Sequence, residues 1–336
     1  MVAPRSAGTA STTGPMTSPA PGAGESTALS GPDSLIRGEH RHPHLGLGGR
    51  RSRTTARHWR RTTLSAAQTA VLVVVAFLFA FPILWMFASA FKRTSSVVRD
   101  AFPLSWKSFL PAEPTMANFV TLFTRLHFGR DFLNTLIVSV AQVTLTLIVA
   151  TFAGYAFGRL QFRGRNVLFA ATLLGAFIPV EAMVIPMYGV TKHLGLLSTY
   201  PGIFLPFAFS PFAIYLMRQS FKSLPNETFE SAKLDGASTL RLFWHVGLPS
   251  VRPALASLVL IQFINSWSNF FWPLIAMQDP AKQVAQVSMA GYADNANTPL
   301  YGEIFAASAL LTLPLVLLAL GLQRYYVAGL ASSGLK

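Results

Sequence analysis

The sequence predicts an all-α membrane protein with six transmembrane helices and a pair of short cytoplasmic helices between the fourth and fifth spans. Only 12% of the 336 residues are charged, against about 25% in soluble domains, whereas 51% are hydrophobic. Five stretches without Asp, Glu, Lys or Arg are each at least 20 residues long, the length that a helix needs to cross the hydrocarbon layer. They are residues 62–91, 132–158, 193–217, 253–278 and 304–323.

Residues 1–61 are expected to form a disordered, basic, cytoplasmic tail. Met1 to Asp33 are rich in Ser, Thr, Gly, Pro and Ala, so this part has too little apolar surface to offset its chain entropy. The alternating histidines of residues 39–44 are only a weak signal for metal binding, because the tract is flexible and interrupted by proline. Six arginines within residues 50–61 are typical of a cytoplasmic anchor against anionic lipid.

Charge and cysteine usage exclude several classes of function. The net charge of +14 does not favour a nucleic-acid partner, because nine of the 27 Lys and Arg lie in residues 1–61 and most others flank apolar runs. The chain contains no cysteine, so it has no disulfide, thiolate metal site or cysteine nucleophile.

The six predicted spans follow from the uncharged runs and from one interrupted run. They cover about 66–91, 132–157, 167–189, 197–217, 253–277 and 304–323 within a transmembrane domain of residues 62–336. The first span is too long for the apolar core of a signal peptide, and no small-residue cleavage pattern follows it. We therefore expect it to remain in the mature protein.

The third span is interrupted by a carboxylate between two prolines. Pro179 and Pro186 bracket Glu181, and we expect the helix to kink or end near Pro179. Two interpretations of Glu181 remain open. It is an intramembrane functional group, or the helix has already reached the outer interface and the carboxylate is in water.

The distribution of basic residues predicts that both termini are cytoplasmic. With this orientation the inner flanks carry sixteen Lys and Arg, and the outer segments carry eight. The positive-inside rule favours this arrangement. The outer segment 92–131 is an exception, since it carries six basic residues. Part of it, near Arg125 and Arg130, is compatible with an interfacial amphipathic helix.

The polar segment 223–249 predicts two short helices that meet at an angle. Pro225 suits a first helical turn, and Gly236 suits the left-handed position after the first helix. Ser238 can cap the second helix, and Pro249 is expected to stop it before the fifth span. Such a pair suits docking to a soluble partner, although an interfacial helix lying on lipid has a similar pattern.

The fifth predicted span carries amides and indoles in an apolar run. Gln262, Asn265 and Asn269 share one helical face, and Trp267 and Trp272 lie beside them. Amides pair with sugar hydroxyls, and the C–H faces of sugars pack on aromatic rings, so these five residues are candidate substrate contacts. The alternative is hydrogen bonding between spans, with the tryptophans at the outer interface.

The pattern within 223–249 resembles the coupling-loop signature of ATP-binding-cassette (ABC) importer permeases. That signature is Glu-Ala-Ala, three residues, Gly, nine residues, then Ile-x-Leu-Pro. Five of its seven positions are identical here, with Ser231 in place of the first Ala and Val246 in place of Ile. The matching segment contains the candidate coupling residues Glu230, Ser231, Ala232, Asp235, Gly236, Val246, Leu248 and Pro249.

Flanking motifs are similar to those of the maltose-type carbohydrate permeases. These motifs are Ile185-Pro-Met-Tyr, Leu194 to Pro201, Ala232 to Ser238, Trp267 to Leu274 and Leu322 to Leu330. The likeness covers roughly residues 65–336. It implies a multi-pass permease in a bacterial cytoplasmic membrane that imports a sugar or oligosaccharide. It also implies a second permease subunit, two cytoplasmic ATPase subunits that bind ATP and Mg, and an extracellular solute-binding protein.

Three other functions remain as alternatives. An ABC importer permease for a non-sugar solute shares the coupling signature. A stand-alone secondary transporter predicts intramembrane charges, for which Glu181 is the one candidate, and internal repeats, which are not evident. An intramembrane enzyme lacks a suitable His, Asp or Glu constellation within the spans. The sequence has no Gly-x4-Gly-Lys-Ser/Thr phosphate loop, so we expect no cofactor and no ATP on this chain.

Overall fold

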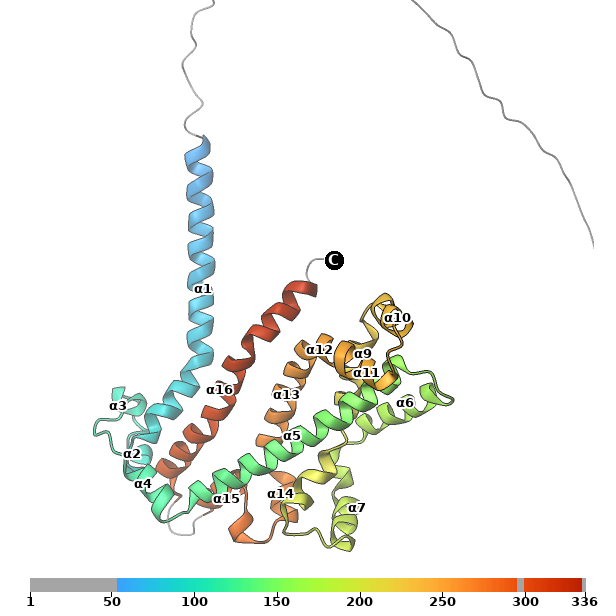
Figure 1. Cartoon of the computed structure of the whole chain (residues 1–336). Helices are drawn as coiled ribbons and strands as arrows, with labels where there is room; N and C mark the ends of the chain where they lie inside the picture. The colour runs from blue at the N-terminus through green and yellow to red at the C-terminus, as the bar shows by residue number, and fades with distance from the viewer. Residues whose placement is uncertain (1–52, 295–298, 334–336) are drawn as a thin grey trace, which may run out of the picture. The chain divides into compact units, whose positions relative to one another are not determined.

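The computed structural model describes residues 53–294 and 299–333, and in this part every regular element is helical (Figure 1). The predicted all-α class is thus confirmed for the described residues. Contacts divide the chain into two units, residues 1–65 and 66–336. The histidine tract 39–44 and nearly all of the predicted disordered tail lie outside the described residues. The part of the tail that is described, from Arg53 on, is helical.

Within the described residues, three helices are long and apolar enough to cross a membrane without a break. They belong to α1 (Arg53–Ala90), α5 (Phe128–Arg159) and α16 (Tyr301–Ser333). Helix α1 extends into the predicted tail because residues 53–65 contain no glycine or proline that would end it. Its apolar residues from Val71 to Phe79 are exposed, as expected of a surface that faces lipid or another subunit.

Three pairs of helices, each bent at a short break, pass the same test of length and composition, so the described residues hold up to six candidate spans if each pair is counted as one span. Residues Arg165–Phe177 and Val180–His193 meet at 105°, Tyr200–Phe207 and Pro211–Lys222 at 49°, and Thr239–Ser250 and Arg252–Trp267 at 73°. The first bend lies at Pro179, as the sequence predicted, since proline there is the N-cap of α7. The first bent pair consists of α6 (Arg165–Leu174) with η1 (Gly175–Phe177), followed by α7 (Val180–His193). The second consists of α8 (Tyr200–Phe204) with η2 (Leu205–Phe207), followed by α9 (Pro211–Lys222). The third consists of α11 (Thr239–Leu242), the π-helical η3 (Phe243–Gly247) and α12 (Leu248–Ser250), followed by α13 (Arg252–Trp267).

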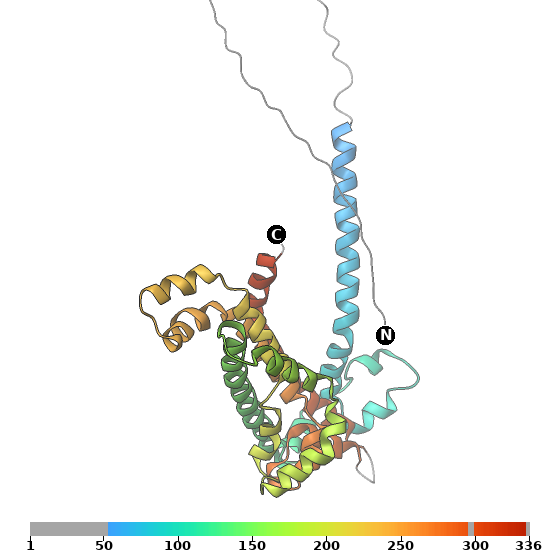
Figure 2. The same cartoon turned by 90° about the vertical axis from the view of Figure 1, so that its right-hand side faces the viewer.

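Short helices connect these spans. Near the end of α1 lie α2 (Thr94–Arg99), α3 (Trp106–Phe109) and α4 (Ala117–Thr124). The others are α10 (Asn226–Leu234), α14 (Phe271–Ala276), η4 (Pro280–Lys282) and α15 (Ala285–Ala293). Within residues 66–336, helices α10 to α12 lie toward the same end as the last turns of α16 (Figures 1 and 2). Helices α7, α14 and α15 lie toward the opposite end.

The centre of unit 66–336 is the pairing of α5 with α9 and α13. Gly154 and Gly158 of α5 let the backbone of α9 approach closely, because a Cβ at Gly154 would lie 2.5 Å from Cβ of Met217. Small residues at such a crossing are typical of membrane helix pairs. Around this crossing, Phe221 and Leu258 are fully buried. The packing fixes α5 as the element that runs from one end of this unit toward the other.

Candidate functional site

Helices α10 and α11 form the angled pair that segment 223–249 predicted. Pro225 is the N-cap of α10, and Gly236 adopts φ +78°, so the predicted left-handed turn is confirmed. Backbone bonds from Gly236 N to Lys233 O (2.9 Å) and from Ala237 N to Ala232 O (3.0 Å) close that turn. The hydroxyl of Ser238 accepts a hydrogen bond from Arg241 N at 3.3 Å, which confirms the predicted cap.

The second helix ends at Ser250, one residue after Pro249, which agrees with the predicted stop before the fifth span. Pro249 lies in the short helix α12, which directly continues η3. The chain turns only at Val251, and the segments before and after it meet at 73°. The second predicted helix is not purely α-helical, since residues 243–247 form a π-helical turn.

The candidate coupling residues divide into an outward and an inward set. Glu230, Ser231, Asp235 and Gly236 are exposed to solvent. The half-buried residues are Ala232, Val246, Leu248 and Pro249, of which the first three pack against a cluster around Phe229, Leu242 and Phe243. The inward set therefore fixes the helix pair to the helical bundle, and the outward set presents polar groups to whatever lies beyond.

Two residues of α5, one turn apart, hold the helix pair. Arg159 donates to Phe221 O at 2.7 Å, to Leu224 O and to the Asn226 Oδ1 at 2.7 Å. Its guanidinium also lies 4.2 Å from the centre of the Phe229 ring. Tyr155 donates from its hydroxyl to Thr239 O at 3.3 Å. The start of each short helix is thereby connected to the end of one spanning helix.

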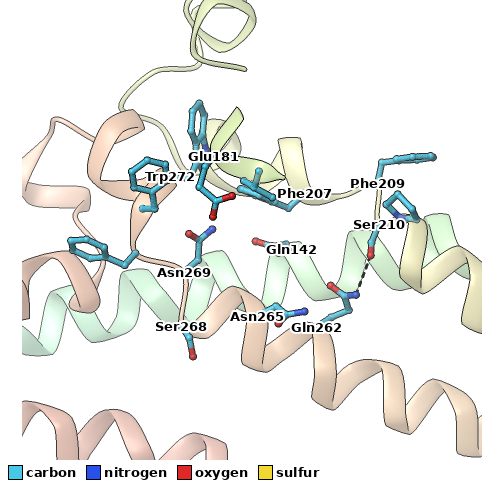
Figure 3. A pocket seen from close by; sticks show the side chains of 14 residues that line it. Gln142, Glu181, Phe207, Phe209, Ser210, Gln262, Asn265, Ser268, Asn269 and Trp272 are labelled. Atoms are coloured by element: carbon cyan, nitrogen blue, oxygen red, sulfur yellow. Dashed lines mark hydrogen bonds between the residues drawn. The ribbon is translucent and has the colours of Figure 1, made fainter. Parts of the chain in front are cut away.

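A cavity of about 580 Å³ lies where α7, α9, α13 and α14 meet α5 (Figure 3). A volume of this size holds a small organic ligand. Its lining combines amides, one carboxylate, hydroxyls and aromatic rings. The lining residues are Gln142, Val180, Glu181, Phe207, Phe209, Ser210, Pro211, Gln262, Asn265, Ser268, Asn269, Phe270, Phe271 and Trp272.

The amides of the cavity have two different environments. Gln142 and Gln262 are buried and fixed, since Ser266 donates to Gln142 Oε1 at 2.9 Å and Gln262 donates to Ser210 at 3.2 Å. Asn265 is exposed and Asn269 is half-buried. The side chains of these two asparagines make no hydrogen bond within the described part of the chain, so their donors and acceptors are available to a ligand.

Glu181 is the one ionisable residue in the lining. It sits in the first turn of α7, just after the bend at Pro179, and its side chain is exposed. Figure 3 shows its carboxylate directed into the cavity, toward the amide of Asn269. It thus borders the cavity on the described chain. Among residues 68–294 and 299–323, no three His, Cys, Asp or Glu side chains lie together in a group that could hold a metal ion.

The two tryptophans do not lie as the sequence suggested. Trp267 is absent from the lining and only 1% exposed, and its indole donates to Leu311 O of α16 at 3.0 Å. It is therefore packed between helices instead of facing a ligand, because its ring stacks on Phe263 on the opposite side of α13 from the cavity amides. Trp272 borders the cavity but is fully buried, donating to Gly202 O at 3.0 Å.

The chain also breaks where the sequence predicted continuous helix. Residues Ser268 to Phe270 interrupt the predicted span 253–277, and α14 starts only at Phe271. Asn269 lies in this break. It lines the cavity with Asn265 as predicted, but from the irregular segment after α13 and not from the same helical face. No proline or glycine within 268–270 marks the interruption in the sequence.

Several residues at these sites were not singled out from the sequence. Gln142 and Ser210 line the cavity from two other helices, and only the fold brings them to Gln262. On α10, Leu234 is 89% exposed. Its position within the matching segment 230–249 was the available signal, because that segment resembles a docking loop for a soluble partner.

Comparison with known proteins identifies relatives across most of the chain. Residues 150–332 match the family described as binding-protein-dependent transport system inner membrane component. The arabinooligosaccharides transport system permease protein AraQ of Halalkalibacterium halodurans is 31% identical over 278 residues, covering 81% of this chain and 97% of the relative. The diacetylchitobiose uptake system permease protein NgcG of Streptomyces coelicolor is 31% identical, covering 80% and 88%. The lactose transport system permease protein LacG of Rhizobium radiobacter is 30% identical, covering 82% and 97%.

Two solved structures have the same fold. One is a bacterial ABC transporter involved in the import of the acidic polysaccharide alginate, with a TM-score of 0.67 and 24% identity over 83% of this chain and 100% of that chain. The other is a bacterial alginate ABC transporter in complex with a periplasmic protein bound to an alginate pentasaccharide. Its TM-score is 0.52 and its identity 18%, over 79% of this chain and 96% of that chain.

Proposed function

The chain belongs to the family of binding-protein-dependent transport system inner membrane components, and from this we propose that it carries an uncharged sugar or oligosaccharide through the cavity around Asn265 and Asn269. It is an inner-membrane, multi-pass permease subunit of an ABC importer, and ATP hydrolysis belongs to a separate subunit. We take both termini to be cytoplasmic, as the basic residues predict.

The composition of the cavity supports an uncharged saccharide. Its amides and hydroxyls match sugar hydroxyls, and Phe207, Phe209 and Phe271 supply apolar walls for the C–H faces of a ring. No lysine, arginine or histidine is among the lining residues. An anionic cargo would therefore meet the carboxylate of Glu181 without a basic partner from this chain, which opposes its entry. The names of the relatives AraQ, NgcG and LacG agree with an oligosaccharide or disaccharide cargo.

The exposed face of the helix pair α10–α11 is the docking site for a cytoplasmic ATPase subunit in this proposal. Glu230, Leu234 and Asp235 are exposed together on or next to α10. An apolar anchor surrounded by charged residues is the usual composition of a small protein interface. The complete importer would contain a second permease subunit, two ATPase subunits that bind ATP and Mg, and an extracellular solute-binding protein.

Helix α5 provides the connection between the two sites, and this observation carries the mechanism. It holds the helix pair through Tyr155 and Arg159 and lines the cavity through Gln142. These positions are 17 residues apart at most, or about 26 Å along a helix. Movement of a docked ATPase would thus shift α5 as a rigid element and change the cavity. The chemistry of this chain is then a switch between two conformations that nucleotide biases from another subunit.

A pair of matched variants tests the docking site. Leu234→Asp, combined with Glu230→Arg, is expected to abolish copurification of the ATPase subunit while membrane insertion and pairing with the second permease persist. Leu194→Asp is the control, because Leu194 is also an exposed leucine but lies at the C-terminus of α7, at the opposite end of this unit. Full recovery of the ATPase with the α10 variant would show that the helix pair is not the docking surface.

The cargo is tested in proteoliposomes that contain the assembled importer and its binding protein. We expect ATP-dependent accumulation of at least one neutral labelled oligosaccharide from a panel that includes arabino-, gluco-, galacto- and chito-oligosaccharides. Accumulation of none of them, together with uptake of an amino acid or phosphate, would overturn the sugar assignment but keep the permease function.

A further inference from the structure

The segment between α1 and α4 presents large apolar side chains to its surroundings. Phe102 is 82% exposed, Leu104 is 71% exposed and Trp106 is 61% exposed, and Leu110 is exposed beside them. We call these four residues the apolar loop face. They follow one another within nine residues, which is far more concentrated than the isolated apolar residues of an ordinary protein surface.

The loop that carries this face is held firmly from inside. Lys92 is buried and donates from Nζ to Lys107 O at 2.8 Å and to Ser108 O at 2.7 Å. Trp85 of α1 donates to the same Ser108 carbonyl at 2.9 Å. Ser105 and Ser108 form a capping box at the start of α3. The part of the loop around α3 is therefore a formed surface, with backbone partners for the N–H groups of Ser108 and Leu110 as well as for the Lys107 and Ser108 carbonyls.

Contacts with the first spanning helix place the loop at the level of the bilayer. The ring of Phe109 lies 5.7 Å from the ring of Phe81. Phe81 is nine residues before Ala90, the last residue of α1, which corresponds to about 14 Å along a helix. The hydrocarbon layer is about 30 Å thick, so a residue at this depth lies within one leaflet. Figure 2 shows the loop beside the last turns of α1.

Basic residues border the apolar loop face. Arg93, Arg99 and Lys107 are exposed, and Lys107 Nζ lies 6.0 Å from the centre of the Trp106 ring. Apolar side chains flanked by tryptophan and basic residues are typical of the zone between acyl chains and headgroups. These cations are half of the six basic residues in the outer segment 92–131, the segment that departs from the charge rule of the other loops.

We propose that the apolar loop face, formed by Phe102, Leu104, Trp106 and Leu110, inserts into the outer leaflet of the membrane, with Arg93, Arg99 and Lys107 on anionic lipid headgroups. Lipid is the occupant that fits this surface, because the contact of Phe109 with Phe81 places the loop beside the first spanning helix, and tryptophan with basic residues is the composition of the headgroup zone. The lipid contact anchors the end of α1 where the chain leaves the bilayer. It also accounts for basic residues on the outer side, since they act locally on headgroups.

This chain contains no cysteine, so a direct test is possible when the partner subunits are cysteine-free variants. Single-cysteine variants Phe102→Cys, Leu104→Cys and Trp106→Cys are labelled with a polarity-sensitive fluorophore in the assembled importer. The complex is reconstituted into vesicles of phosphatidylethanolamine and phosphatidylglycerol, with or without lipids brominated on their acyl chains. We expect strong quenching by the brominated lipids at all three positions and little quenching by aqueous iodide.

Glu113→Cys is the control, because Glu113 is exposed on the same outer segment but lies beyond the apolar loop face. Its label is expected to be quenched by iodide and not by brominated lipid. The proposal is overturned if labels at 102–106 respond like the one at Glu113, which places the loop in water. It is also overturned if they respond to neither quencher, which places them under the second permease or another subunit.

Discussion

Arg159, in the last turn of α5, donates to Oδ1 of Asn226, the first residue of α10, at 2.7 Å. The same guanidinium bonds the carbonyls of Phe221 and Leu224, so it spans the whole connection from α9 to α10. Only a planar group with several N–H donors can satisfy these acceptors together. Arg159 is thus the residue through which α5 and the docking helix are held in register.

Replacing Arg159 should uncouple ATP hydrolysis from transport. In Arg159→Lys the ammonium cannot reach all three acceptors, and lost hydrogen bonds of about 1–2 kcal/mol each loosen the connection. We expect sugar uptake per ATP hydrolysed to fall several-fold while the ATPase still copurifies. Arg165→Lys is the control, since Arg165 bonds only Leu160 O on the described chain. An unchanged uptake ratio in Arg159→Lys would remove this residue from the coupling path.

The close approach of α5 and α9 predicts intolerance at Gly154. A Cβ there would lie 2.5 Å from Met217 Cβ and 2.9 Å from Arg218 N, so the two helices must separate. We expect Gly154→Ala to destabilise the chain by about 1–3 kcal/mol, the usual cost of overpacking, seen as a lower Tm in detergent. Gly189→Ala in α7 has no atom within 4 Å of the new Cβ and should be neutral or slightly stabilising. Equal Tm values for both variants would contradict the packing.

The cavity asparagines should affect transport without affecting folding. Asn265→Ala and Asn269→Ala each remove amide groups that have no partner on the described chain, so we expect weaker substrate affinity and an unchanged Tm. The apparent KM for the sugar should rise by about tenfold, the effect of 1–1.5 kcal/mol for one lost hydrogen bond.

Trp267 provides the opposite behaviour. Its buried indole packs on Phe263 and bonds Leu311 O, so Trp267→Ala should lower stability by about 3–5 kcal/mol. Trp267→Phe should retain most of the packing and normal KM. A raised KM in Trp267→Phe with an unchanged Tm would return this residue to the substrate path.

Sequence periodicity and local signals predicted the helical elements better than their junctions. Charge-free length identified apolar helices because a membrane span has a fixed minimum length. Local chemistry predicted the bend at Pro179, the left-handed Gly236 and the cap at Ser238, since each depends on one residue and its neighbours. The end of the second helix just after Pro249 was predictable in the same way, since proline cannot donate a backbone hydrogen bond within a helix.

The cavity was predictable only in part because it is assembled from distant segments. The amides at i, i+3 and i+7 identified one wall, but Gln142, Glu181 and Ser210 come from other helices. Trp267 was misassigned because aromatic residues serve packing and ligand binding equally well, and its side of α13 depends on where α16 packs. The break at 268–270 follows from tertiary contacts, such as Trp272 with Gly202 O, that no local pattern contains.

The turn between α10 and α11 should accept only residues that tolerate positive φ. Gly236 has φ +78°, and no atom lies within 4 Å of the position that a Cβ would take, so any cost of substitution comes from the backbone alone. Gly236→Val should cost about 1–2 kcal/mol or more and weaken ATPase copurification. Gly236→Asn should retain most of the binding, because asparagine adopts the left-handed region more readily. Equal binding by the two variants would show that the angle between the helices does not determine docking.

Lys92 should control the order of the loop that carries the apolar loop face. Burial lowers the pKa of Lys92, with the negative charge of Asp100 acting in the opposite direction, and its Nζ still bonds two carbonyls of α3. Lys92→Met keeps the apolar stem but leaves the buried Ser108 carbonyl with Trp85 as its remaining side-chain donor. Losing these bonds costs about 1–3 kcal/mol, so amide hydrogen exchange of residues 94–110 should accelerate by at least about fivefold. Lys107→Met removes a neighbouring exposed cation and should leave exchange unchanged.

Because the fold of the loop precedes its insertion, the Lys92→Met chain should also lose brominated-lipid quenching at Trp106→Cys. Faster exchange with full quenching would mean that the lipid orders this loop and that Lys92 does not.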